Sequence, residues 1–253
     1  MRRAAAAAAL LLAAPAALAY LLPPSAVLRR MAQRREALAA PALEVRAALR
    51  AEGEAGRAIA AAAGVPAGGG AVELGAVLSL KAPGRCRLEL AAPAGGEPAW
   101  AAVGRGRLAG ARGLERVPEV AALLRGLCVL LAQRGTGADP GRAWGEELAR
   151  LGVALSEASL ARSGTRVAYV LGASRPREAR PQVWIDKQAW QPLRLVAPLG
   201  GPLDDVRLVD FGSVAGGELF PAAVEVRRDG AVALRLSTEK VAANPRIPDA
   251  LFP

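Results

Sequence analysis

The chain contains 253 residues, enough for one large domain or two small ones with a substantial core. It contains no histidine, which excludes nucleophile–histidine arrangements and HExxH zinc helices. The formal charge is +10, but the arginines are spread along the chain and aromatic residues make up only 4%, which argues against a nucleic-acid-binding protein.

The N-terminus has the pattern of a secretory signal peptide. Arg2 and Arg3 precede an uncharged run of alanine and leucine, and Ala17-Leu18-Ala19 forms a cleavage site. The alternative is an uncleaved anchor helix, but the run is shorter than the roughly 20 residues that span a bilayer. We expect a signal peptide over residues 1–19 and one exported domain over 20–253. Removing the two arginines leaves 31 basic and 23 acidic residues, a net charge of +8.

The first elements predicted after the signal peptide are a helix and a strand. Apolar residues at near-helical spacing between Pro24 and Pro41 predict an amphipathic helix over 25–40. Apolar and polar residues alternate over 43–50, which is typical of a strand with one wet face. Residues 51–70 are rich in alanine and glycine and are expected to form a loose connection that can include a helical turn.

Two further strands are predicted on either side of Pro83-Gly84. On the first strand, one face carries the apolar residues Val72, Leu74, Ala76, Leu78 and Leu80. On the second strand, Cys86, Leu88 and Leu90 share a face, and Arg85 and Arg87 lie opposite. The alternation therefore assigns the cysteine to the apolar face and the arginines to the outward face.

The pattern becomes helical after a predicted strand pair over 99–112. Residues 115–134 are apolar on nearly every side apart from Arg125, which predicts a buried helix. A second helix follows, with Trp144, Leu148 and Leu151 on one stripe.

Strands return from residue 153 onward. Asp229-Gly230 between two alternating runs is a strong hairpin signal. Meandering strands without regular βαβ alternation predict an antiparallel α+β domain, with helices gathered against one sheet face.

Candidate catalytic groups are few. Asp204, Asp205 and Asp210 are interpreted as hairpin and surface positions rather than paired catalytic carboxylates. The glycine- and arginine-rich stretch at 104–113 lacks the lysine and hydroxyl of a phosphate-binding loop. We therefore expect a protein that is not an enzyme, with no catalytic residues, metal or cofactor. In an oxidising compartment Cys86 and Cys128 either pair or remain small buried residues.

Several motifs resemble one known family. KAPGRCRLEL, followed by GRGRLAG, resembles a strand–turn–strand segment of the periplasmic lipoprotein carriers of Gram-negative bacteria, the LolA/LolB-like group. PQVWIDKQAWQPLRLV resembles the hairpin of that family, and DVRLVDFG and NPRIPDALF follow in the family's order. The matching residues are Lys81, Pro83, Gly84, Arg85, Arg87, Trp184, Ile185, Asp186, Pro192, Arg194, Asn244, Ile247, Pro248 and Phe252.

The resemblance implies an incomplete, strongly curved antiparallel β-barrel, with helices covering its concave face over an apolar cavity for acyl chains. Its partners would be lipoprotein acyl chains or another lipid, an inner-membrane release complex and an outer-membrane acceptor, and the carrier would be monomeric. The residues expected to line the cavity are Leu74, Leu78, Leu80, Leu88, Leu90, Leu123, Leu127, Leu131 and Trp144.

One position departs from the family pattern. Family carriers place an arginine directly before the strand proline, where it holds the lid helices shut, and a phenylalanine three residues after that proline. Here these positions are Ala82 and Cys86. Arg85 and Arg125 are candidate rim or lid contacts in its place. A disulfide between Cys86 and Cys128 would tie the lid to the sheet, if the Cα atoms lie within about 7 Å.

Two functions follow as hypotheses. The first is a periplasmic carrier that shields acyl chains between membranes. The second is an envelope scaffold or sensor that uses the same half-barrel to bind a protein partner, which a filled interior would favour.

Overall fold

The computed structural model describes residues 21–91, 96–135, 138–176 and 179–253, and the predicted signal peptide lies outside these ranges. Twelve antiparallel strands form one sheet, in the order β5-β4-β3-β2-β1-β12-β11-β10-β9-β8-β7-β6. The strands are β1 Ala42–Ala51, β2 Val72–Lys81, β3 Arg85–Leu90, β4 Trp100–Gly104, β5 Arg107–Ala111, β6 Ala158–Ser163, β7 Arg166–Leu171, β8 Gln182–Asp186, β9 Pro192–Ala197, β10 Asp204–Val209, β11 Ala223–Arg228 and β12 Ala231–Ala243.

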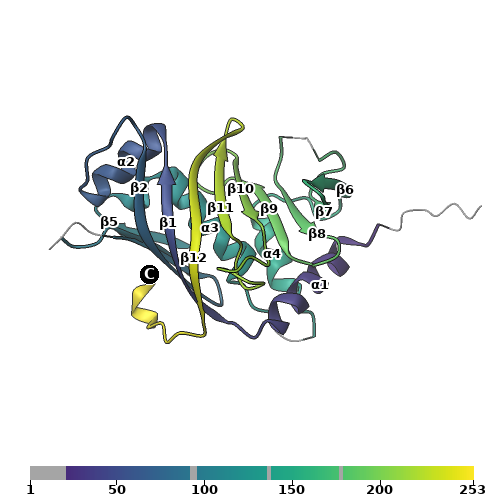
Figure 1. The fold of residues 1–253 in the computed structure, drawn as a ribbon. Coiled ribbons are helices and arrows are strands. Elements are labelled where there is room, and N and C mark those ends of the chain that lie inside the picture. The colour runs from purple at the N-terminus through teal and green to yellow at the C-terminus, as the bar shows by residue number, and fades with distance from the viewer. Residues whose placement is uncertain (1–20, 92–95, 136–137, 177–178) are drawn as a thin grey trace, which may run out of the picture.

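The sheet consists of two meanders joined by the pairing of β1 with β12 (Figure 1). Leu49 lies opposite Leu236 at this junction, and each of these strands also pairs with its own chain neighbour. The sheet does not close, because β5 and β6 lie at opposite edges. The predicted α+β class with an unclosed antiparallel sheet is therefore confirmed.

Within the described ranges four α-helices accompany the sheet: α1 Pro24–Ala37, α2 Gly53–Ala63, α3 Pro118–Leu131 and α4 Arg142–Arg150. Helix α3 packs against strands of both meanders, and α1 and α4 pack against each other. Figure 1 shows α3 and α4 on one side of the sheet. We call this side the inner face and the opposite side the outer face. Short 3-10 turns cover Leu114–Arg116 and Asp249–Leu251.

The prediction of a loose connection over 51–70 is wrong, because α2 occupies 11 of these residues. Eight of its 11 residues are alanine or glycine and Ile59 is its one large apolar residue, so no stripe of large apolar side chains marks the helix in the sequence. Gly64 ends the helix with φ of 72°, the left-handed conformation that glycine adopts without strain. The helices predicted over 25–40 and 115–134 and the Asp229-Gly230 hairpin are confirmed.

The core lies between α3 and the inner face. Alternation along each strand directs one set of apolar side chains inward, as in β3, where Cys86, Leu88 and Leu90 are buried. A second, smaller apolar cluster of Ala168, Val170, Ala173, Trp184 and Leu193 is separate from this core. The predicted faces of β2 and β3 are therefore confirmed.

Candidate functional site

Helix α3 is the centre of the candidate site. Twelve of its 14 residues are buried, which covers every side of the helix. It approaches β10 closely at Gly126, where an added Cβ would lie 3.1 Å from Cγ2 of Val206. Such contact on all sides means that α3 is embedded in the protein rather than resting on its surface.

The residues predicted to line a lipid cavity lie together in one core cluster. Leu78 and Leu88 are cross-strand partners in β2 and β3, and α3 packs against β3. Leu74 is half-buried against the cluster. The other eight are at most 6% exposed: Leu78, Leu80, Leu88, Leu90, Leu123, Leu127, Leu131 and Trp144. In this structure the space between α3 and the inner face is filled by these side chains.

The C-terminal half of α3 is attached to the turn between β2 and β3. Cys86 and Cys128 form a disulfide with their Cα atoms 5.7 Å apart. The backbone N–H of Gly84 donates to the carbonyl oxygen of Ala132 at 2.7 Å. The turn that carries Ala82 instead of the family arginine thus holds the helix through a covalent bond and a backbone hydrogen bond.

The N-terminal half of α3 is attached through arginines. Arg228 bridges Glu119 of α3, at 2.9 Å, and Asp204 of β10, at 3.0 Å. Arg125 donates to the carbonyl oxygen of Leu199, in the connection between β9 and β10. Arg125 therefore connects α3 to the segment between β9 and β10.

The interpretation of Asp204 as a surface residue is wrong, since its side chain is only 1% exposed. One carboxylate oxygen accepts the backbone N–H groups of Leu199, Gly200 and Gly201, at 3.2, 2.6 and 2.8 Å. The other oxygen accepts from Arg228. Asp204 therefore fixes the loop on which the N-terminal end of α3 rests.

Arg85, predicted as a rim or lid contact, makes its ion pair away from α3. It alternates with Cys86 and so lies on the outer face, where it pairs with Asp249. Lys81 joins the same carboxylate at 2.6 Å and also donates to the carbonyl oxygen of Ile247 at 2.7 Å. The hydrogen bond from Lys81, together with the charge of Arg85, lowers the pKa of Asp249. These cations fasten the C-terminal segment to the outer face.

A cavity of about 420 Å³ lies where α1 and α3 end, beside the turn between β2 and β3. Its walls include Arg35, Ala40, Pro41, Ala82 and Leu131, and we call it the α1–α3 cavity. Arg35 is buried, and it was not among the residues predicted from the sequence. Its position four residues after Met31 and three before Leu38 places it on the apolar stripe of α1, which is a signal of burial in the sequence.

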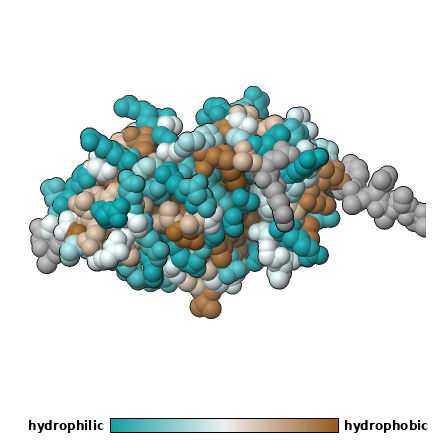
Figure 2. All heavy atoms as spheres, turned by 90° about the horizontal axis from the view of Figure 1, so that it is seen from above, coloured by the Kyte–Doolittle hydropathy of each residue, from teal (hydrophilic) through white to brown (hydrophobic). Residues whose placement is uncertain are grey.

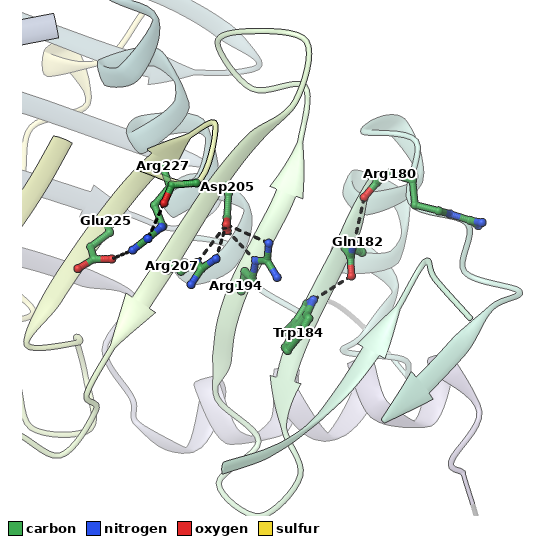
Figure 3. Close-up of polar contacts among 9 residues, drawn as sticks. Arg180, Gln182, Trp184, Arg194, Asp205, Arg207, Glu225 and Arg227 are labelled. Atoms are coloured by element: carbon green, nitrogen blue, oxygen red, sulfur yellow. Dashed lines mark hydrogen bonds and ion pairs between the residues drawn. The ribbon is translucent and has the colours of Figure 1, made fainter. Parts of the chain in front are cut away.

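The outer face carries a polar network across β8 to β11 (Figure 3). Arg194 forms a bidentate pair with Asp205, at 2.7 and 2.9 Å, and Arg207 shares the same carboxylate. The guanidinium of Arg194 also lies 5.0 Å from the ring centroid of Trp184. Several arginines of this face are thus paired with acidic side chains.

The described ranges contain no group of three or more histidine, cysteine, aspartate or glutamate residues placed to hold a metal ion. None of the helices within these ranges is long and apolar enough to cross a membrane.

No protein-family model and no curated protein matches the chain. Solved structures with a similar fold include a LolA superfamily protein from Nitrosomonas europaea, with 15% identity over 92% of this chain and 98% of that one and a TM-score of 0.47. An outer membrane lipoprotein-sorting protein domain from Vibrio parahaemolyticus has 9% identity over 87% of this chain and 93% of that one, with a TM-score of 0.39. The MucA/MucB complex of Pseudomonas aeruginosa has 13% identity over 90% of this chain and 60% of the matched chain, with a TM-score of 0.31.

At these identities and TM-scores the likenesses show neither a ligand nor a partner of this chain.

Proposed function

We propose that the protein is a non-enzymatic periplasmic carrier that binds acyl chains of a lipoprotein or another lipid between α3 and the inner face of the sheet. One observation carries the proposal: an unclosed sheet presents a continuous aliphatic face that is covered by a separate apolar helix. Transfer of an acyl chain to such a surface is favourable by about 25 cal/mol per Å² of apolar area removed from water. In this proposal residues 1–19 are the signal peptide and residues 20–253 form the carrier domain.

Binding would require α3 to move, because the interior is filled by side chains in the structure described here. An acyl chain would take the place that Leu123, Leu127 and Leu131 occupy against β2 and β3. The two ends of α3 are held differently: salt bridges and hydrogen bonds at the N-terminal half, a disulfide at the C-terminal half. We infer that the disulfide holds α3 against the sheet in place of the family arginine, since residue 82 is alanine in this chain. Movement of α3 would then begin at its N-terminal half, where the attachment is not covalent.

The proposal is tested by uptake of a fluorescent fatty acid by the purified protein, with its disulfide intact and after reduction. We expect uptake in both states and faster uptake after reduction, because α3 then loses its covalent attachment. Native mass spectrometry of freshly purified protein should show bound lipid. Repeated absence of lipid, together with no uptake in either redox state, would count against the carrier.

A substitution in the core tests whether the fatty acid binds between α3 and the sheet. Leu123→Arg places a charge among fully buried aliphatic side chains, so both uptake and stability should fall sharply. Uptake and stability equal to those of the unmodified protein would show that Leu123 does not lie in the binding surface.

The filled interior favours a second candidate, an envelope scaffold or sensor that binds a protein partner. Under this function the core leucines only support the fold, and the outer face with its arginine–carboxylate network would contact the partner. A protein that takes up no fatty acid in either redox state, yet keeps a cooperative unfolding transition, would shift the balance to this function.

A further inference from the structure

The α1–α3 cavity contains a buried guanidinium without a carboxylate partner. Only 8% of Arg35 is exposed. Its Nη1 donates to the carbonyl oxygen of Leu219 at 3.0 Å, and its Nη2 donates to that of Leu131 at 3.3 Å. Among the residues that the structure describes, no carboxylate lies within ion-pair distance of Arg35.

A charge removed from water in this way is costly unless an opposite charge compensates it. Burial, together with the neighbouring charge of Arg34, lowers the pKa of Arg35 to about 10, so the group remains protonated at neutral pH. The two carbonyl oxygens satisfy hydrogen bonds but carry only partial charges. Arg34, the chain neighbour of Arg35, is less buried and is paired with Glu218.

The remaining lining of the cavity suits an amphiphile. Ala40, Pro41, Ala82 and Leu131 supply apolar walls. The charged residues of the lining are Arg35, Arg134 and Glu36, a balance of one positive charge. The volume of about 420 Å³ falls within the range of about 300–1,000 Å³ found for small-molecule sites.

We propose that the α1–α3 cavity binds the anionic group of a single-chain lipid, a carboxylate or a phosphate, with the Arg35 guanidinium as its charge partner. The first part of the acyl chain lies against Leu131 and Ala82. This inference rests on the proposed carrier function and narrows its ligand to a lipid with a negative charge at one end.

A purely structural role for Arg35 makes a different prediction. Its hydrogen bond to Leu131 lies at the C-terminal end of α3, where a cation is favourable without any ligand. Loss of a purely structural role would destabilise the protein and would therefore weaken binding of charged and neutral lipids alike. Loss of a charge partner would weaken binding of the charged lipid alone.

The experiment compares palmitate with its neutral methyl ester by displacement of an uncharged apolar dye. For Arg35→Gln we expect palmitate to bind about tenfold more weakly or worse, the loss typical of a charge-assisted hydrogen bond, while the methyl ester changes by less than about twofold. Arg29→Gln is the matched control from the same helix, because its side chain is 51% exposed and does not line the cavity. It should leave both affinities unchanged.

A second variant tests the site independently in case Arg35→Gln does not fold. Ala82→Phe fills the cavity from the opposite wall and leaves the hydrogen bonds of Arg35 in place, so it should also abolish the preference for palmitate. An unchanged preference in folded Ala82→Phe would overturn the inference.

The remaining outcomes separate the inference from the carrier function. Equal weakening of palmitate and its ester by Arg35→Gln overturns the headgroup site and leaves the carrier standing. Binding of neither lipid to the unmodified protein overturns both. Stabilisation by inorganic phosphate that is lost in Arg35→Gln, without palmitate binding, would identify a free-anion site and overturn the lipid assignment.

Discussion

Two adjacent aspartates show how strand alternation gives the same side chain two different roles. Asp204 lies on the inner face, where it accepts three backbone N–H groups and Arg228. Asp205 lies on the outer face and accepts from Arg194 and Arg207. The first carboxylate therefore organises a loop beneath α3, whereas the second joins side chains that remain partly in contact with water.

This difference predicts unequal costs for the same substitution. Asp204→Ala leaves buried N–H groups and the Arg228 guanidinium without their acceptor, and we expect it to lower the free energy of unfolding by about 3–5 kcal/mol. Asp205→Ala breaks a bidentate pair whose side chains keep some contact with water, and it should cost less, about 1–2 kcal/mol. Urea denaturation of the two variants measures the difference. Equal costs would show that the loop does not depend on Asp204.

The same local alternation explains what the sequence could predict. It separated Cys86 from Arg85 and identified the faces of β2 and β3, because residues with a period of two must lie on opposite sides of a strand. It also places Asp204 on the same face as Val206 and Leu208, which is a signal of burial. The hydrogen-bond partners of Asp204 could not be predicted, because the sequence of the loop at 199–201 carries no signal of that contact.

At the scale of whole elements, helices were predictable where apolar residues have helical spacing and not elsewhere. Helix α3 is strongly apolar and was recognised, whereas α2 consists largely of alanine and was not. Whether α3 covers an open cavity or a filled core could not be predicted, because alanine, leucine and valine suit both. The difference between an open cavity and a filled core depends on the distance between α3 and the sheet, and at Gly126 that distance is short.

The close approach of α3 to β10 provides the second prediction. Gly126→Ala places a methyl group against Val206 and should destabilise the protein by about 1–3 kcal/mol, as overpacked cores do. A Val206→Ala background removes the two nearest methyl groups and leaves only the Cβ of residue 206, 3.3 Å away. The same change should therefore cost much less there or become neutral, because alanine also favours a helix over glycine.

A double-mutant cycle measured by urea denaturation tests this reduction of the cost. The two substitutions should deviate from additivity by more than about 0.5 kcal/mol, the scatter found for independent sites. Additive effects would mean that α3 can shift away from β10 at little cost, which would itself indicate a helix that is ready to move.

At the scale of the molecule, the positive charge is distributed rather than concentrated. Figure 2 shows hydrophilic residues scattered over the face seen from above, with apolar patches between them. Many arginines are paired with acidic neighbours, as Arg194 is with Asp205 and Arg235 with Glu225. The net charge should therefore give only a diffuse attraction to anionic surfaces, which added salt weakens.

This distribution predicts how lipid binding responds to salt. If acyl chains are buried between α3 and the sheet, fatty-acid affinity should change by less than about threefold from about 0.1 M to about 1 M sodium chloride, because apolar burial is insensitive to screening and a buried ion pair is screened little. Adsorption of the protein to anionic vesicles should fall steeply over the same range, since the screening length there decreases from about 10 Å to about 3 Å. Measuring both in the same titration separates interior binding from surface attraction. A parallel loss of the two signals would place the fatty acid on the arginine-rich surface and remove the support for an interior site.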